Sequence, residues 1–69
     1  MNHVNQQSMC KVRAKYSYHD CVEYDWFMFD RYHVVAVDYG TNQNLPSVYL
    51  DVNIRLFVHP DDFKALSWI

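Results

Sequence analysis

Apolar and polar residues alternate strictly over two long stretches of this 69-residue chain, and no other feature constrains its fold as much. Successive side chains of a β-strand point to opposite faces, so a period of two predicts half-buried strands. In residues 10–18 the apolar set alternates with Lys11, Arg13 and Lys15. In residues 48–59 one set of alternate positions is entirely aliphatic: Val48, Leu50, Val52, Ile54, Leu56 and Val58. We expect residues 48–59 to form a single central strand.

The middle of the chain has the same β character. Residues 22–29 alternate and then become apolar on both faces, and residues 32–39 are rich in valine, so each is predicted to be a strand with a turn at Asp30–Arg31. The alternative is one long, bent strand over 22–39 with a bulge near Asp30. Residues 40–47 hold the only glycine, two asparagines and a proline, and are predicted to be a loop.

The end of the chain has the signals of a short helix. Pro60 ends the preceding strand and suits the first helical turn, Asp61 and Asp62 favour a helix N-terminus, and Phe63, Leu66 and Ile69 recur at helical spacing. The predicted fold is therefore α+β: a small antiparallel sheet of three to four strands with one short C-terminal helix packed on one face. Residues 1–8 are polar and predicted to be a flexible arm, and residues 9–69 a single domain.

Composition excludes several function classes. One glycine rules out a glycine-rich phosphate loop, and a net charge of −2 does not suit a strongly DNA-neutralising protein. Neither a secretory leader nor an apolar run of membrane-spanning length is present, so we expect a cytoplasmic protein with Cys10 and Cys21 reduced.

The candidate chemistry is weak. Four histidines and two cysteines lack the paired spacing of structural zinc sites, so we expect no metal and no cofactor. Cys21 beside His19 suggests a thiol nucleophile, but one thin sheet with one short helix can hardly build the enclosed site such a nucleophile needs. We therefore expect the protein not to be an enzyme.

Aromatic residues are in surplus. If the helix covers one face of the sheet, Phe27, Phe29, Tyr49 and Phe57 lie on the other and would leave an apolar patch that is rare on a solitary monomer. We expect something to bind there: a second copy in a homodimer, a protein partner or nucleobases.

The segment 20–39 combines this aromatic surplus with a local charge of −4. Acidic side chains could steer the encounter with a basic surface while aromatic anchors supply affinity. The predicted protein-binding residues are Glu23, Asp25, Trp26, Phe27, Phe29, Asp30 and Tyr32. A compact chain of this kind without a catalytic motif looks like the small inhibitors and modulators of phages and viruses, here one that would occupy a nucleic-acid-binding surface of its target.

A second hypothesis uses the cations of residues 10–18. Lys11, Arg13 and Lys15 would lie in a row about 7 Å apart on one face of a strand, where they could follow the phosphates of a single-stranded nucleic acid. Charged side chains also mark an exposed sheet edge that avoids aggregation, and we favour the protein partner over this alternative.

Overall fold

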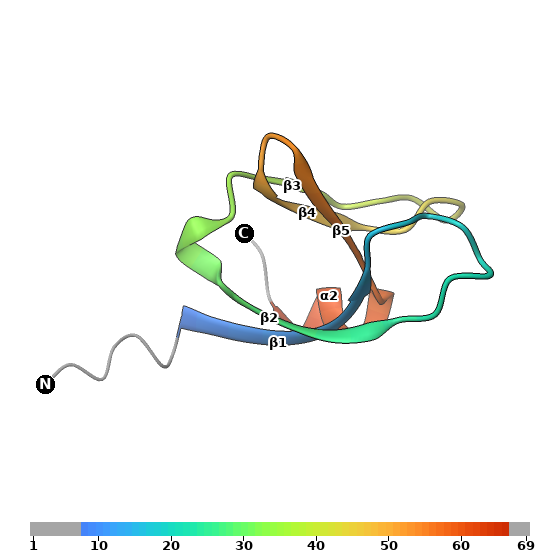
Figure 1. Cartoon of the computed structure of the whole chain (residues 1–69). Coiled ribbons are helices and arrows are strands. Elements are labelled where there is room, and N and C mark those ends of the chain that lie inside the picture. The colour runs from blue at the N-terminus through green and yellow to red at the C-terminus, as the bar shows by residue number, and fades with distance from the viewer. Residues whose placement is uncertain (1–7, 67–69) are drawn as a thin grey trace, which may run out of the picture.

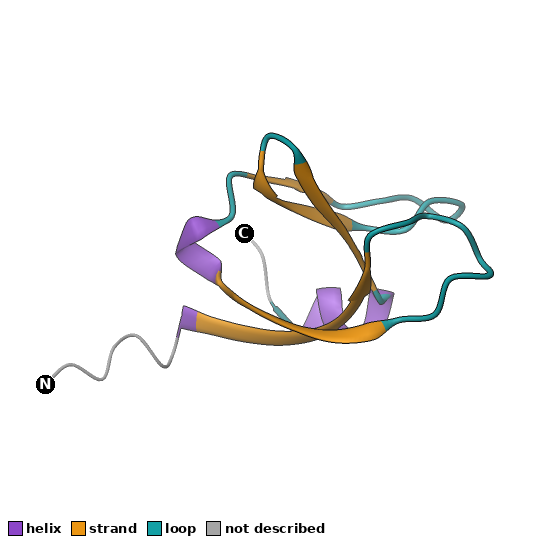
Figure 2. Cartoon of the chain, viewed as in Figure 1, coloured by secondary structure: helices purple, strands orange, loops and turns teal. Residues whose placement is uncertain are grey.

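A small antiparallel sheet with one short C-terminal helix forms the protein, as Figures 1 and 2 show for the computed structural model, which describes residues 8–66. The strands are β1 (Met9–Lys15), β2 (Asp25–Asp30), β3 (Ala36–Asp38), β4 (Ser47–Asp51) and β5 (Ile54–Val58). They lie in the order β2-β1-β5-β4-β3, and every neighbouring pair is antiparallel. The predicted fold class is confirmed, although the described chain has five strands and not three or four.

The sheet curves around its own inner face. In Figure 1, β1 and β2 lie below, β3 and β4 lie above, and β5 runs between the two levels. The buried core accordingly draws on most of the elements, with Val12 of β1, Phe29 of β2, Val48 of β4, Leu56 of β5 and Phe63 of the helix. A curved sheet covers part of its own inner face, so the small helix does not have to cover it alone.

The expected single strand over residues 48–59 is wrong, because this stretch is the β4–β5 hairpin. Asp51 and Ile54 face each other across a turn of two residues, and the Asn53 N–H donates to Asp51 Oδ1. Paired residues share a face, so a two-residue turn alone would reverse the alternation between Asp51 and Ile54. The register shift between Tyr49 and Asp51 restores it, so Val48 and Leu56 face each other in the core and the period of two continues into β5. Val52 looks like a strand residue in the sequence but is exposed at the tip of the hairpin.

The predicted strands in the first half of the chain are longer than the observed ones. The chain leaves the sheet after Lys15, and residues 16–24 form a loop before β2 begins at Asp25. The turn expected at Asp30–Arg31 is present as the short 3-10 helix η1 (Arg31–His33), which Asp30 caps by accepting the Tyr32 N–H. The alternative of one long, bent strand is therefore wrong.

The C-terminal helix α2 (Pro60–Ala65) begins at the predicted proline. Its Phe63 and the following Leu66 are buried in the core, as the helical spacing predicts, whereas Ile69 lies outside the described residues. The predicted arm of residues 1–8 also lies outside them, apart from Ser8, which is buried.

Candidate protein-binding surface

The outward side of the β1–β2 ladder brings together the largest side chains that this part of the sheet leaves uncovered. The register pairs Met9 with Asp30, Lys11 with Met28, and Arg13 with Trp26. These six residues share one face, because the alternate residues of both strands, such as Val12 and Phe29, are buried on the other. We call these six residues the outer face.

Three apolar side chains of the outer face are exposed. Trp26 is 59% exposed, Met28 63% and Met9 42%, although all three lie in regular strands. Trp26 and Met28 are two residues apart on one strand, and Met9 lies diagonally across from Met28. Lys11 Nζ lies 5.2 Å from the centre of the Trp26 ring, a cation–π contact that orients the indole. The result is an apolar surface with a positive charge beside it.

Arg13 connects this face to the helix. Its Nη2 lies 2.8 Å from Asp62 Oδ1, while Nε and the backbone N–H both donate to Oδ2, at 2.9 and 2.8 Å. The Arg13 guanidinium and backbone N–H lower the pKa of Asp62 to about 2. The hydrogen bond that Arg13 donates to Asp62 in turn raises the pKa of Arg13. The carboxylate therefore fastens α2 to β1.

Lys15 does not continue a row of exposed cations. It is buried, and its ammonium donates to the carbonyl oxygens of His19 at 2.9 Å and Val22 at 3.1 Å, so it holds the loop of residues 16–24. Since Arg13 is paired with Asp62, Lys11 alone among these three cations is exposed without a carboxylate partner. The structure thus gives little support to the nucleic-acid hypothesis.

The predicted protein-binding residues do not all share one surface. Glu23, Asp25 and Trp26 are exposed, and Tyr32 is 79% exposed on η1. Phe29 is buried in the core, and Phe27 is half-buried on the same inner face, with its ring against that of Tyr16 at 5.3 Å. Asp30 is half-buried and caps η1.

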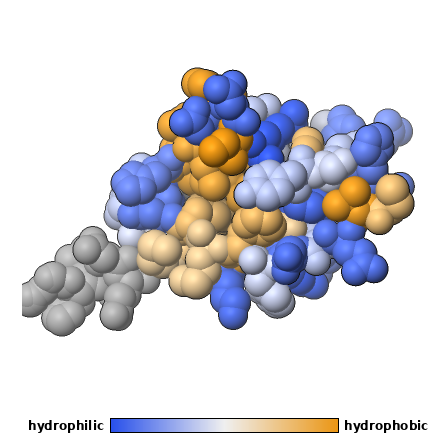
Figure 3. Space-filling view, in the orientation of Figure 1, coloured by the Kyte–Doolittle hydropathy of each residue, from blue (hydrophilic) through white to orange (hydrophobic). Residues whose placement is uncertain are grey.

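The predicted apolar patch of Phe27, Phe29, Tyr49 and Phe57 is therefore not exposed as one surface. Tyr49 and Phe57 are half-buried under Arg55, whose guanidinium carbon lies 5.2 and 4.5 Å from their ring centres. Figure 3 shows that apolar atoms instead form a stripe from the tip of the β4–β5 hairpin to the β1–β2 ladder. Exposed residues from this part of the molecule include Met28, Val52 and Ile54. The uncovered apolar surface thus extends from the hairpin tip to the β1–β2 ladder.

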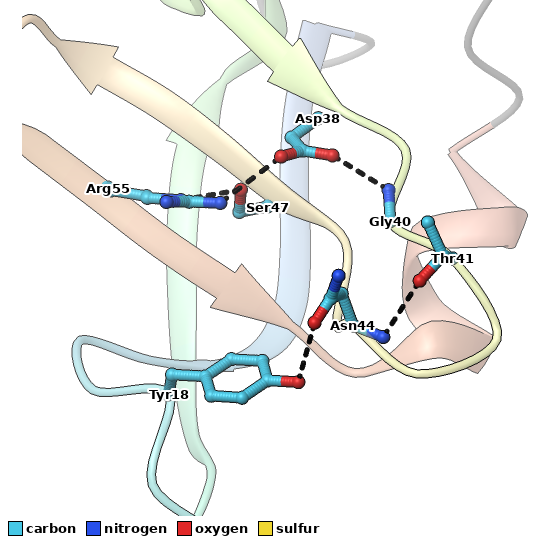
Figure 4. Close-up of polar contacts among 7 residues, drawn as sticks. All are labelled: Tyr18, Asp38, Gly40, Thr41, Asn44, Ser47 and Arg55. Atoms are coloured by element: carbon cyan, nitrogen blue, oxygen red, sulfur yellow. Dashed lines mark hydrogen bonds and ion pairs between the residues drawn. The ribbon is translucent and has the colours of Figure 1, made fainter.

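A concave region lies beside the loop between β3 and β4, where two depressions of about 430 and 500 Å³ meet at Tyr18. Figure 4 shows that its polar groups bind one another. Asp38 accepts the Gly40 N–H at 2.9 Å and pairs with Arg55 at 3.2 Å, and the Tyr18 hydroxyl donates to the Gln43 carbonyl at 2.7 Å. These groups hold the loop between β3 and β4 in place and join it to Tyr18.

Gly40 is required in that loop. Its φ is +74°, and a Cβ there would lie 2.6 Å from the Asn44 carbonyl oxygen. The loop closes directly on this glycine, which is the only one in the chain.

The described residues contain no group of three or more metal-binding side chains, and both cysteines are free, Cys10 buried and Cys21 exposed. None of the helices within residues 8–66 combines the length and apolar character needed to cross a membrane. No protein-family model, curated protein or solved structure matches this chain.

Sequence reasoning missed Met9 and Met28 as surface residues. The signal was present, because both alternate with buried positions in the same way as Trp26. Asp62 was assigned to the helix N-terminus alone, and its bonds to Arg13 across 49 residues had no signal in the sequence.

Proposed function

We propose that this protein is a small non-enzymatic binding module of the inhibitor or modulator type, which attaches to a protein target through its outer face. The observation that carries the proposal is the row of exposed Trp26, Met28 and Met9 on regular strands of a small domain. Exposed apolar surface of this kind on a soluble chain marks an interaction site. Tryptophan is also among the residue types most enriched in the energetic centres of protein interfaces.

The charges around this surface suggest the chemistry of the target. Glu23 and Asp25 are exposed at the start of β2, and Lys11 lies beside Trp26. A complementary target would offer an apolar pocket for the indole, basic groups toward Glu23 and Asp25, and an acidic or carbonyl group toward Lys11. A nucleic-acid-binding surface of the target would supply these basic groups.

A non-enzymatic role is supported by how the charged groups are used. The two Arg–Asp pairs, Arg13 with Asp62 and Arg55 with Asp38, join separate elements of the fold. The Arg55–Asp38 pair borders the depression at Tyr18, but its atoms, like those of the Arg13–Asp62 pair, are engaged in hydrogen bonds that hold the fold together.

Site-specific cross-linking in the cells that make the protein tests the proposal. With the photoreactive residue benzoylphenylalanine in place of Met28, we expect a discrete cross-linked protein, and the same residue in place of Val52 should give none. Trp26→Ala in the Met28-labelled chain should weaken binding of the identified target by about 2 kcal/mol, roughly thirtyfold. Equal cross-linking from positions 28 and 52, or binding unaffected by Trp26→Ala, would refute the outer face as the binding site.

A further inference from the structure

β2 is an edge strand, and its peptide groups on the open side can be identified from the hydrogen bonds of its neighbour. The Arg13 N–H donates to Asp62 and the Arg13 carbonyl accepts the His59 N–H at 2.9 Å, so both groups point away from β2. Arg13 and Trp26 are therefore a non-hydrogen-bonded pair, and so are Lys11 and Met28 two residues away. Consequently the N–H and C=O groups of Trp26 and Met28 point away from β1, toward the open edge.

Most of these outward groups have no partner. The Trp26 N–H is bound by the carboxylate of Asp25 at 2.9 Å. The Trp26 carbonyl and both peptide groups of Met28 make no hydrogen bond within the described residues. Met28 therefore presents a donor and an acceptor side by side, as a strand does to an incoming neighbour.

Apart from the acids at its two ends, this edge lacks the usual protection against strand addition. Natural edges are guarded by lysine, proline, bulges or very short strands. β2 has six residues, contains neither lysine nor proline, and pairs with β1 in an unbroken register. The opposite edge of the sheet, β3, has only three residues, so β2 is the better template.

The charges along the edge indicate what an added strand should carry. Asp25 and Asp30 stand at the two ends of β2, Glu23 precedes it, and Phe27 and Met28 occupy its centre. A complementary segment is therefore apolar in the middle and basic at both ends.

A second copy of this chain fits the edge poorly. In an antiparallel pair of two copies, the outward peptide groups of one β2 must bind the outward groups of the other. Trp26 would then face Met28, with the two-fold axis at Phe27, or Met28 would face Met28, with the axis at Met28. In either register, Asp25 of one copy lies within one residue of Asp30 of the other, at both ends of the interface. The two carboxylates lie on opposite faces of the sheet and are not a cross-strand pair, but both copies bring acids to these ends and neither brings the cations that would complement them.

We therefore propose that the open edge of β2 binds an extended segment of the protein target as an additional strand, and that this segment is apolar at its centre with Lys or Arg at both ends. The inference rests on the proposed function and identifies the partner's chemistry. Peptide groups of Met28 would supply affinity, and the neighbouring Trp26 side chain would cover the outer face of the added strand.

Selection from a displayed library of random peptides about ten residues long, enough to span β2, tests this proposal with the whole chain as bait. We expect enriched peptides to alternate β-branched or aromatic residues between flanking Lys or Arg. The decisive variant is Met28→Pro, which removes the outward N–H without removing a hydrogen bond to β1. It should weaken the best peptide at least tenfold, whereas Met28→Ala, which keeps the N–H, should weaken it less than threefold.

Further controls separate the possible failures. Phe27→Pro removes an N–H that faces β1 and should lower the melting temperature, unlike Met28→Pro. If Met28→Pro does not fold, a synthetic chain with N-methylated Met28 replaces it. No enrichment, enriched peptides without flanking cations, or equal binding by Met28→Pro would overturn the added strand. A wild-type dimer that dissociates on Met28→Pro would also overturn it, because a second copy of the chain would then occupy the edge of β2. If Trp26→Ala still weakens binding of the target identified by cross-linking while Met28→Pro does not, the proposed function stands and the added strand falls.

Discussion

Asp62 shows how one residue can hold two distant parts of this chain. β5 ends at Val58, opposite Ala14, so no strand residue of β5 accepts the backbone N–H of Arg13. The Asp62 carboxylate accepts this N–H instead, and it also accepts hydrogen bonds from the Arg13 guanidinium. The sequence places an acid here for the first turn of α2, and this part of the prediction is confirmed. Its partner could not be predicted, because it depends on where the helix meets β1.

The Asp62–Arg13 pair should make stability depend on acid pH. The pKa of Asp62 is about 2 in the folded chain against an ordinary 3.8, so the folded state holds fewer protons between these values. The stabilisation is complete above about pH 4 and is lost as the pH falls toward 2. Asp62→Asn should lower the melting temperature at pH 7 by about 5 °C, and the difference from wild type should shrink at pH 2.

Asp61→Asn is the matched control, since the Asp61 side chain is exposed on the same helical turn and makes no described hydrogen bond. Thermal unfolding followed by circular dichroism at both pH values gives the comparison. A melting difference for Asp62→Asn that stays constant from pH 7 to pH 2 would contradict the assignment.

At the scale of elements, strand type was predictable but strand ends were not. The alternation of apolar and polar residues correctly placed the start of β1 near Cys10. The same alternation continues in the sequence past Lys15, where the chain forms a loop, and through the two turn residues of the β4–β5 hairpin. A period of two indicates which face of an extended chain each side chain lies on. It does not indicate whether the backbone is hydrogen-bonded to a neighbouring strand. The helix was predicted more closely because Pro60 marks its start chemically.

The loop of residues 16–24 should depend on Lys15. Its buried ammonium satisfies two loop carbonyls and lies 4.9 Å from the centre of the Tyr24 ring. Lys15→Met keeps the apolar stem but leaves both carbonyls without this donor, and should cost about 1–3 kcal/mol of unfolding free energy. The loop should also become sensitive to chymotrypsin at Tyr18.

Lys11→Met provides the comparison, because Lys11 is an exposed lysine of the same strand. It should change the unfolding free energy by less than about 0.5 kcal/mol. Urea denaturation and timed proteolysis measure the two effects. Equal stability of the two variants would show that Lys15 is a surface cation after all.

At the scale of the whole molecule, curvature decides which aromatic residues are core and which are surface. The composition correctly indicated more large apolar side chains than one short helix can cover. Because the sheet covers its own inner face, Phe29 is buried, and the exposed apolar residues within β1 and β2 are Trp26, Met28 and Met9. Composition predicted a binding partner, and we propose that this partner binds at the outer face and the open edge of β2.

The acids at the ends of β2 should keep the protein from pairing with itself through this edge. Asp25→Lys would place a cation within one residue of Asp30 of a second copy, although on the opposite face of the sheet, and so replace the longer-range repulsion by attraction at both ends. We expect light scattering after size-exclusion chromatography to give the 8.3 kDa of one chain for the wild type and twice that mass for Asp25→Lys. Glu23→Lys, with the same change of charge just before the strand, should remain monomeric. A monomeric Asp25→Lys, or a dimeric wild type, would contradict this role of the acids.

Alternation and helix signals in the sequence alone determined an antiparallel sheet with a C-terminal helix, because side-chain periodicity follows from local backbone geometry. The tertiary structure alone decided that Lys15 is buried, that Asp62 binds Arg13 and that β2 is left as an open edge. Each of these depends on which distant segments become neighbours, and that follows from the curvature and strand order of the whole sheet, which no local pattern encodes.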